Sequence, residues 1–559
     1  MMDASEFDPE PDNGETREQR ETLKDFFVDR GDGARGLLPA EQKALDAAIL
    51  GIKCEIADER PTEMTVENRL RAKFLRFLIL GAGEEIFVHE RGVHLVGGYI
   101  EGPLELDYIR CPTPLSLEKC EFEKRFAGLG ARFVALILNG SRCHGVNFDD
   151  ARFTSSVEMA QGFECNGPVR LTGVCIGGDL NFQGAKLVNP DGDALAARRI
   201  IVGRSVFLTN GVVADGRVRL SGAEIGGDLS FFGGRFIRRK AAIPSDPYEM
   251  PRADYALTLT NVHIKSVLWL GPWTKPFDKQ VRIEGSLNLQ GAYAATLADD
   301  EHSWPVKSIV TDDGKRVPCI IALDGFVYDR LRAGAPIRAS IRQKWLMRTQ
   351  PRKGGPEFRP QPFEQLISVL RRMGFEQDAR RIGLLKEHEL QEVRVKRASF
   401  WARPFLEIFG AFWGGFAGYG YKPHRLVVML FSLWALSSVF FYAAEKAGGF
   451  VPLDPDVWAN EMVIRECGTD DWTVCPRVAR IMPFNAVSYA ADTILPVIDL
   501  QQRSSWTPML NGLMLDLPLI GEMYLPYGGL YSVTWVVNIL GALGAILLGA
   551  IMSGLVTKD

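Results

Sequence analysis

A stretch of 21 residues occurs twice in this chain of 559 residues. The first copy, GPVRLTGVCIGGDLNFQGAKL, covers residues 167–187, and the second, GRVRLSGAEIGGDLSFFGGRF, covers residues 216–236. The copies share 12 identical positions at an offset of 49 residues. A fixed period of this kind is typical of repeat architectures, in which each unit packs against its neighbours along one axis. No other feature of the chain restricts its possible folds as much.

Apolar residues within each copy come in pairs two positions apart, such as Val169/Leu171 and Leu180/Phe182. Both members of such a pair face the same side of an extended segment. Successive pairs begin about five residues apart, which is too short for hairpin strands. We therefore predict a chain that turns a corner every few residues, with Gly177-Gly178 and Gly226-Gly227 permitting the turns. Coils of this kind stack at a strand spacing of about 4.8 Å.

The short turning strands resemble those of pentapeptide-repeat and bactofilin-like β-solenoids. In particular, IGGDLNFQGAKL followed by an NPDG turn is similar to a family of bacterial membrane-associated proteins, some of which are labelled membrane-associated oxidoreductases. The resemblance covers the chain from about residue 65 to the C-terminus. It implies a β-solenoid with helical caps followed by transmembrane helices, and its only functional implication is the oxidoreductase label.

Composition restricts the class of protein further. The formal net charge of −4 offers no basic face, so we expect no nucleic-acid partner. Seven of the nine cysteines are scattered through the repeats and their flanks without metal-ligand spacing, which indicates small buried residues in a reducing compartment. Residues 1–34 carry eleven acidic and four basic residues and lack an apolar core, so neither a signal peptide nor a folded tail is expected.

The pattern changes several times along the chain and predicts six parts. They are a disordered acidic tail (1–35), a helical N-terminal cap (36–91), a cytoplasmic β-solenoid (92–331), a helical hairpin (332–398), an interfacial segment rich in Trp and Phe (399–424) and a membrane module (425–559).

The membrane module contains two uncharged stretches long enough to cross a bilayer, at about 426–444 and 530–556. The loop between them, residues 446–527, holds five basic and ten acidic residues, whereas basic residues gather before the first stretch. The positive-inside rule then places both termini in the cytoplasm and the loop outside. We expect a multi-pass protein of a bacterial inner membrane, with the lipid bilayer as a partner.

Three groups of residues in this module are candidate site residues. Cys467 and Cys475, in the outer loop, could form a disulfide in an oxidising compartment. Small residues recur at every fourth position of the second span and predict a packing face, toward the first span or toward another copy of the chain: Gly541, Ala545, Gly549 and Ser553.

The third group lies between the spans, where a short apolar segment ends in a turn containing Thr493, Pro496 and Asp499. A span, a short helix, a turn and a second span distantly resemble the two-span pore module of ion channels. The turn lacks the glycine of a TVGYG-type filter, so both a conducting pore and a non-conducting relative remain open.

The sequence contains no constellation that predicts catalysis. No C-x-x-C pair or complete G-x-G-x-x-G occurs, the seven histidines are dispersed, and Cys143 and His144, as neighbours on a strand, should face opposite sides. We expect no catalytic residue, no cofactor and no metal. The function predicted is a non-enzymatic scaffold or sensor that binds a cytoplasmic protein partner. The alternatives are a pore gated by the solenoid and the oxidoreductase of the family label.

Overall fold

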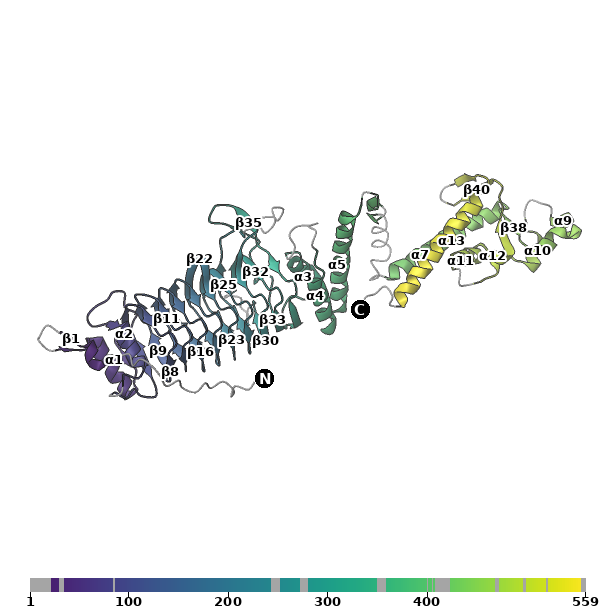
Figure 1. Ribbon diagram of the computed structural model, residues 1–559. Helices are drawn as coiled ribbons and strands as arrows, with labels where there is room; N and C mark the ends of the chain where they lie inside the picture. The colour runs from purple at the N-terminus through teal and green to yellow at the C-terminus, as the bar shows by residue number, and fades with distance from the viewer. Residues whose placement is uncertain are drawn as a thin grey trace. The chain divides into compact units, whose positions relative to one another are not determined.

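The computed structural model describes residues 22–29, 35–83, 86–242, 252–271, 280–348, 358–399, 401–404, 406–407, 423–467, 472–495, 499–518 and 521–553. The chain divides into two compact units, Met1–Ile382 and Gly383–Asp559, which are described separately (Figure 1). The predicted interfacial segment, 399–424, lies mostly outside the described residues.

Unit 1 is built from two large parallel β-sheets, with 17 strands in sheet 1 and 16 in sheet 2 among the described residues. From β8 to β21, two consecutive strands enter sheet 1 and the next two enter sheet 2, after which the chain returns to sheet 1; further on, single longer strands such as β22 and β30 take the place of pairs. Figure 1 shows the resulting rows of short strands from β8 and β9 to β33. The predicted run of short, turning strands is present as these two parallel sheets.

The strands are short. Sheet 1 contains β3 (Cys54–Glu55), β5 (Val93–Val96), β8 (Arg110–Cys111), β9 (Leu115–Glu118), β12 (Arg132–Phe133), β13 (Leu136–Ile137), β16 (Arg152–Phe153), β17 (Val157–Glu158), β20 (Cys175–Ile176), β21 (Leu180–Asn181), β23 (Ile201–Val202), β24 (Val206–Phe207), β26 (Glu224–Ile225), β27 (Leu229–Ser230), β30 (His263–Trp269), β33 (Tyr293–Ala298) and β37 (Val327–Leu331). Sheet 2 contains β4 (Arg69–Arg71), β6 (Tyr99–Glu101), β7 (Leu104–Glu105), β10 (Glu121–Phe122), β11 (Phe126–Ala127), β14 (Arg142–Cys143), β15 (Val146–Asn147), β18 (Glu164–Asn166), β19 (Val169–Arg170), β22 (Lys186–Ala196), β25 (Val213–Arg219), β28 (Arg235–Ile237), β29 (Tyr255–Thr258), β31 (Arg282–Glu284), β32 (Ser286–Asn288) and β36 (Ile321–Ala322).

Parallel register stacks like residues above one another, and this builds the core. Phe133 pairs with Phe153 in the next turn of chain, and their rings stack 5.1 Å apart. Leu136 pairs with Val157, which pairs with Leu180, and all three side chains are fully buried. One row of residues thus fills the interior while the adjacent row faces outward, as the two-residue spacing predicts.

The paired glycines have a different physical role from the one predicted. All four glycines of the pairs Gly177-Gly178 and Gly226-Gly227 have a negative φ, which other residues can also adopt. These positions therefore do not need the conformational freedom of glycine. Instead, a Cβ on Gly226 would lie 2.2 Å from the carbonyl oxygen of Gly203, and a Cβ on Gly177 would lie 2.4 Å from that of Thr154. The glycines are needed because successive turns of backbone approach each other too closely for a side chain.

The aspartate that follows each glycine pair belongs to a ladder of side chains along the same corner. The amide of Asp179 donates to Ser156 Oγ (3.0 Å), and the amide of Ser205 donates to Asp179 Oδ1 (2.8 Å). The amide of Asp228 then donates to Ser205 Oγ (3.1 Å), and that of Val267 to Asp228 Oδ1 (3.0 Å). Each of these amides donates to a side-chain oxygen of the preceding turn of chain. Backbone hydrogen bonding therefore explains the aspartate of the repeated GGD sequence.

Two helices, α1 (Pro39–Leu50) and α2 (Ala72–Ile79), pack at the N-terminal end of the sheets. The sheets begin earlier than Gly92, because β3 and β4 lie within the segment predicted to be a helical cap. The ordered chain also begins earlier than predicted. The 3₁₀-helix η1 (Leu23–Phe26) and the hairpin β1 (Val28–Asp29) and β2 (Arg35–Gly36) lie within 1–35, since Phe26 is buried against Phe74 and Phe77 of α2.

Helices also cover the last strand. Gln361 and Gln365 of α4 (Gln361–Arg372) donate side-chain amides to the carbonyls of Phe326 and Tyr328 beside and on β37, at 3.3 and 2.6 Å. An open sheet edge invites pairing with other chains, so these bonds protect it. The turn at Gly374 and helix α5 (Glu376–Arg397) follow as predicted, whereas α3 (Ala339–Leu346) and the hairpin of β34 (Ser308–Val310) and β35 (Arg316–Pro318) were not predicted.

A buried ion pair attaches α3 to the sheets. The two terminal nitrogens of the Arg342 guanidinium, Nη1 and Nη2, donate to Asp299 at 2.7 and 2.8 Å, and the two side chains are 0% and 1% exposed. Trp304 also donates its indole N–H to Asp299 (2.9 Å). Because an unpaired buried charge is strongly destabilising, this pair fixes the position of α3.

Unit 2 contains two long helices, α7 (Pro423–Lys446) and α13 (Gly529–Met552), and the predicted outer loop between them is folded. The loop forms β38 (Phe450–Pro452), α8 (Pro455–Ala459), α9 (Glu461–Cys467), α10 (Pro476–Ile481), α11 (Ala486–Ile494), α12 (Gln502–Ser505), β39 (Trp506–Pro508), β40 (Leu513–Leu517) and β41 (Gly521–Leu525). Its aromatic core, which includes Phe450, Tyr489 and Trp506, packs with the adjoining ends of α7 and α13.

The close approach at Gly226 predicts the effect of a single methyl group. Gly226→Ala should lower the free energy of unfolding of unit 1 by about 1–3 kcal/mol, because the backbone oxygen of Gly203 cannot move without breaking the ladder. Thermal or urea unfolding followed by circular dichroism measures the change. Arg204→Ala is the matched control at the same corner, since its side chain is 72% exposed. Equal stability of the two variants would contradict the close-approach explanation.

Candidate functional site

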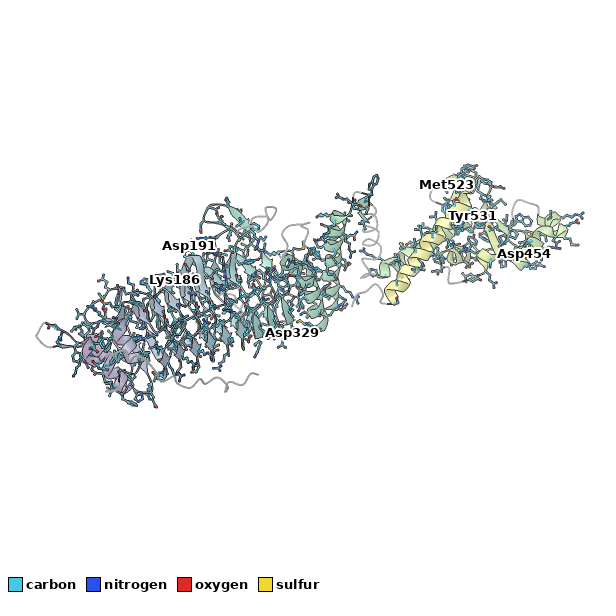
Figure 2. The ribbon with its side chains drawn as sticks, viewed as in Figure 1. Lys186, Asp191, Asp329, Asp454, Met523 and Tyr531 are labelled. Carbon is cyan, nitrogen blue, oxygen red and sulfur yellow. The ribbon has the colours of Figure 1, made fainter. Side chains whose placement is uncertain are left out.

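The outward row of sheet 2 carries charges that alternate in sign and pair with one another. Glu121, Arg142, Glu164 and Lys186 stack in register on β10, β14, β18 and β22, the last of them labelled in Figure 2. Arg142 lies 2.8 Å from Glu164 and 3.7 Å from Glu121, and Arg60 lies 3.4 Å from Glu164. Burial raises the pKa of Glu121, although Arg142 and Arg60 oppose the shift. The opposite charges of this row therefore neutralise one another.

The outward row of sheet 1 is arranged differently. Arg110, Arg132 and Arg152 stack directly above one another on β8, β12 and β16, and all three are exposed. None of the described residues forms an ion pair or a side-chain hydrogen bond with these three guanidinium groups. We call them the arginine column. Further along the row come Cys175, Ile201 and Glu224, so the positive charge is confined to three turns.

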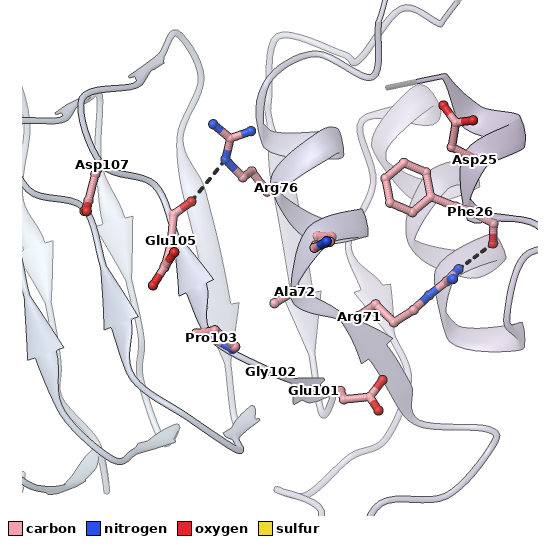
Figure 3. A pocket seen from close by; sticks show the side chains of 11 residues that line it. Asp25, Phe26, Arg71, Ala72, Arg76, Glu101, Gly102, Pro103, Glu105 and Asp107 are labelled. Atoms are coloured by element: carbon pink, nitrogen blue, oxygen red, sulfur yellow. Dashed lines mark hydrogen bonds between the residues drawn. The ribbon is translucent and has the colours of Figure 1, made fainter. Parts of the chain in front are cut away.

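A cavity of about 820 Å³ lies at the N-terminal end of unit 1, between the first described residues, α2 and sheet 2 (Figure 3). Arg71 donates to the buried carboxylate of Glu41 and to the carbonyl of Phe26, and its hydrogen bonds to Glu41 raise the pKa of Arg71. Arg76 donates to the Glu105 carbonyl at 3.1 Å. The described lining is charged but contains no thiol, imidazole or hydroxyl side chain: Asp25, Phe26, Arg71, Ala72, Lys73, Arg76, Glu101, Gly102, Pro103, Glu105 and Asp107.

Six of the seven cysteines of unit 1, all but Cys175, are buried and are therefore poor nucleophiles. Burial raises the pKa of Cys54 and Cys319 to about 11 and that of Cys120 and Cys165 to about 12, and it raises those of Cys111 and Cys143 as well. A reactive cysteine needs a lowered pKa and access to solvent.

Cys143 is fully buried while His144 is exposed, so the two face opposite sides as predicted. No group of three or more His, Cys, Asp or Glu side chains suited to a metal ion occurs among the described residues.

In unit 2, the segments His424–Lys446 of α7 and Gly529–Ala550 of α13 are long and apolar enough to cross a membrane. Only 22% of the most apolar window of each helix is buried inside the structure. Large apolar side chains therefore face outward, including Leu436 (72% exposed) and Ile546 (67% exposed). A core helix of a water-soluble protein would hide such residues.

Helix α11 packs against both α7 and α13, and the predicted filter-like turn follows it. Thr493 is buried, but its hydroxyl donates to the Tyr489 carbonyl within the helix (2.7 Å). Asp499 is exposed and accepts the Gln501 amide, and Pro496 lies outside the described residues. The sequence reasoning missed Asp492, a buried carboxylate that accepts the amides of 500, 502 and 503 and closes the turn. Only the tertiary contact distinguishes it from an ordinary helical aspartate.

The four small residues of the second span do not share one environment. Gly541 is buried, and a Cβ there would lie 2.5 Å from the Ile494 carbonyl of α11. Ala545 is partly buried, whereas Gly549 and Ser553 are exposed, and a Cβ on Gly549 would meet nothing within 4 Å. Gly541 therefore serves packing within the chain, and the far end of the row is uncovered.

Cys475 is disulfide-bonded, whereas the seven cysteines of unit 1 are free thiols. The side chain of Cys467 lies outside what the structure describes, so the predicted Cys467–Cys475 pairing stays a prediction.

No protein-family model, no curated protein and no solved structure matches the chain.

Burial of the thiols predicts their order of modification. In the native protein, iodoacetamide should alkylate Cys175, the partly exposed thiol, roughly tenfold or more faster than Cys120, Cys143 or Cys165. Peptide mass spectrometry at several times measures the four rates, and the denatured chain, in which the rates should converge, is the control. Fast modification of a buried cysteine in the native chain would show a reactive thiolate and favour redox chemistry.

The environments of Gly541 and Gly549 predict opposite effects of the same substitution. Gly541→Leu should displace α11 and lower the thermal stability of unit 2, because the new side chain meets backbone. Gly549→Leu should leave stability unchanged in a single chain. Thermal unfolding and the oligomeric state in detergent are measured for both variants. A Gly549→Leu variant that loses an oligomer present in the parent would identify the uncovered end as a contact between copies.

Proposed function

We propose that this chain is a non-enzymatic scaffold or sensor, anchored in a bacterial inner membrane by α7 and α13, whose sheets bind a cytoplasmic protein partner. The observation that carries the proposal is the apolar surface that both helices expose. Only 22% of the most apolar window of each helix is buried inside the structure. Transfer of such surface from water into hydrocarbon is favourable, and each helix is long enough to span a bilayer.

Several observations support a β-solenoid as the architecture of the proposed scaffold. From β8 to β21 each turn of chain supplies two strands to sheet 1 and two to sheet 2, and the register repeats from one turn to the next. In later turns longer strands such as β22 and β30 replace such pairs, and all pairing within the two sheets is parallel. Solenoids present extended side-chain arrays on their outer faces, which suits them to partner binding. The arginine column is such an array.

The proposed orientation places both termini in the cytoplasm and the loop between the spans outside. It rests on the distribution of Lys and Arg. The cysteines agree with it, because the thiols of the sheets are free whereas Cys475, in the loop, is oxidised.

A two-span pore is the second candidate, and the position of α11 favours it. A short helix that packs between two membrane-spanning helices is the arrangement of a pore module, and such a module conducts only as an oligomer around a central axis. The Thr493 hydroxyl donates to a carbonyl of its own helix, and the Asp492 carboxylate accepts three backbone amides, of residues 500, 502 and 503. Potassium flux into vesicles that contain the full chain would select this candidate over the scaffold.

Charged substitutions in the spans test the anchor. The parent chain should remain with lipid vesicles on flotation after an alkaline carbonate wash. The double variant Leu436→Asp, Ile539→Asp should not, because each charge near the middle of a span costs about 2.5–3.5 kcal/mol of insertion free energy, and the two native side chains are 72% and 52% exposed. Leu453→Asp, at a residue 52% exposed outside the spans, is the control and should float like the parent. A parent chain released by the wash would contradict membrane anchoring.

A further inference from the structure

The arginine column places three like charges at the shortest spacing that a sheet allows. Arg110 pairs with Arg132, and Arg132 pairs with Arg152, in exact register on adjacent parallel strands. Neighbouring strands lie about 4.8 Å apart, and like charges directly opposite each other destabilise a sheet. The repulsion between these three guanidinium groups therefore destabilises sheet 1, whereas the alternating charges on sheet 2 attract one another.

The nearest carboxylates do not relieve this repulsion. Asp150 precedes Arg152 by two residues, but its carboxylate points along the stack to the next turn, where Oδ1 would lie 2.2 Å from a Cβ on Gly173. Asp107 accepts the amide of Leu129 at 2.8 Å. No described residue forms an ion pair with the column, so its exposed guanidinium groups are available to an anionic partner.

We propose that residues 1–21 of the same chain dock on the arginine column. This segment contains eight acidic and two basic residues, with acidic residues spaced two or three apart from Asp3 to Glu21. An extended peptide advances about 3.3–3.6 Å per residue, so carboxylates two or three apart can meet guanidinium groups that span about 10 Å over three strands. The column is then a docking surface for an extended acidic peptide, and the chain supplies its own.

The position at which the segment enters the fold makes this docking possible. Asp25, three residues after Thr22, and Asp107, three residues before Arg110, line the same cavity, on opposite sides in Figure 3. The described residues that follow the acidic segment and the residues that precede the first arginine therefore border one cavity. Twenty-one extended residues reach up to roughly 70 Å, many times the length of the column.

This docking rests on the proposed function only in that it would regulate binding of a partner to the arginine column. The docking itself requires neither a membrane nor a partner. A partner that uses the column would have to displace residues 1–21. Failure of the peptide experiment below would leave the flotation result untouched, and the reverse also holds.

The test measures binding of a fluorescent peptide of residues 1–21 to the full chain and to a chain lacking these residues, both in detergent micelles. Fluorescence anisotropy should show saturable binding to the truncated chain and at least about tenfold weaker binding to the full chain, whose own segment competes. Arg110→Gln, Arg132→Gln and Arg152→Gln together should weaken peptide binding to the truncated chain by about tenfold or more. Binding should also weaken as NaCl is raised from about 50 to about 500 mM.

The matched control removes three exposed cations elsewhere on unit 1, by Arg199→Gln, Arg204→Gln and Lys265→Gln, and should bind the peptide like the truncated parent. Circular dichroism of both triple variants confirms their folding. Three outcomes would overturn the proposal: no binding to the truncated chain, equal loss in both triple variants, or equal binding of a scrambled peptide of the same composition. The last outcome would show that any acidic peptide of another protein fits the column equally well.

Discussion

Hydrogen bonding from each turn of backbone to the next is the interaction on which unit 1 depends. The amide of Phe148 donates to Arg170, that of Leu171 to Ala196, and that of Ala197 to Arg219, at 2.8–2.9 Å. Buried backbone groups must be paired, so the turns stay in register and stack like residues in the core. The same constraint explains the Gly-Gly-Asp corners, where a Cβ has no room, and the glutamines of α4, which bond to the last strand.

Because register fixes which side chains adjoin, it also determines what the outer faces can do. On sheet 2 it places Glu121, Arg142 and Glu164 in sequence, so the charges cancel. On sheet 1 it places three arginines together. In unit 2 the constraint is of another kind, since α7 and α13 satisfy their own backbone groups and leave apolar side chains uncovered. The charge pattern on the faces of one unit and the uncovered apolar side chains of the other therefore follow from separate physical causes.

Much of this architecture could be predicted from the sequence because it is encoded locally. Paired apolar residues identify the short strands, and uncharged stretches identify α7 and α13 to within a few residues. The glycine pairs were found, but their role was misassigned, since close approach between turns is invisible in one turn. The arginine column was missed because the intervals along its row vary, from 22 residues between Arg110 and Arg132 to 20 between Arg132 and Arg152. The Asp299–Arg342 pair likewise depends on a contact between distant segments, and Asp492 is recognised only from the amides, 8 to 11 residues further on, that its carboxylate accepts.

The central claim is that α7 and α13 lie in lipid while the sheets lie in water. Electron cryomicroscopy of the full chain in lipid nanodiscs tests it most directly. We predict that the disc encloses α7 and α13 with the exposed side chains of Leu436 and Ile546 toward lipid, and that sheets 1 and 2 lie outside the disc. A map in which protein from another part of the chain, or from a second copy, covers both helices outside the disc would contradict the claim.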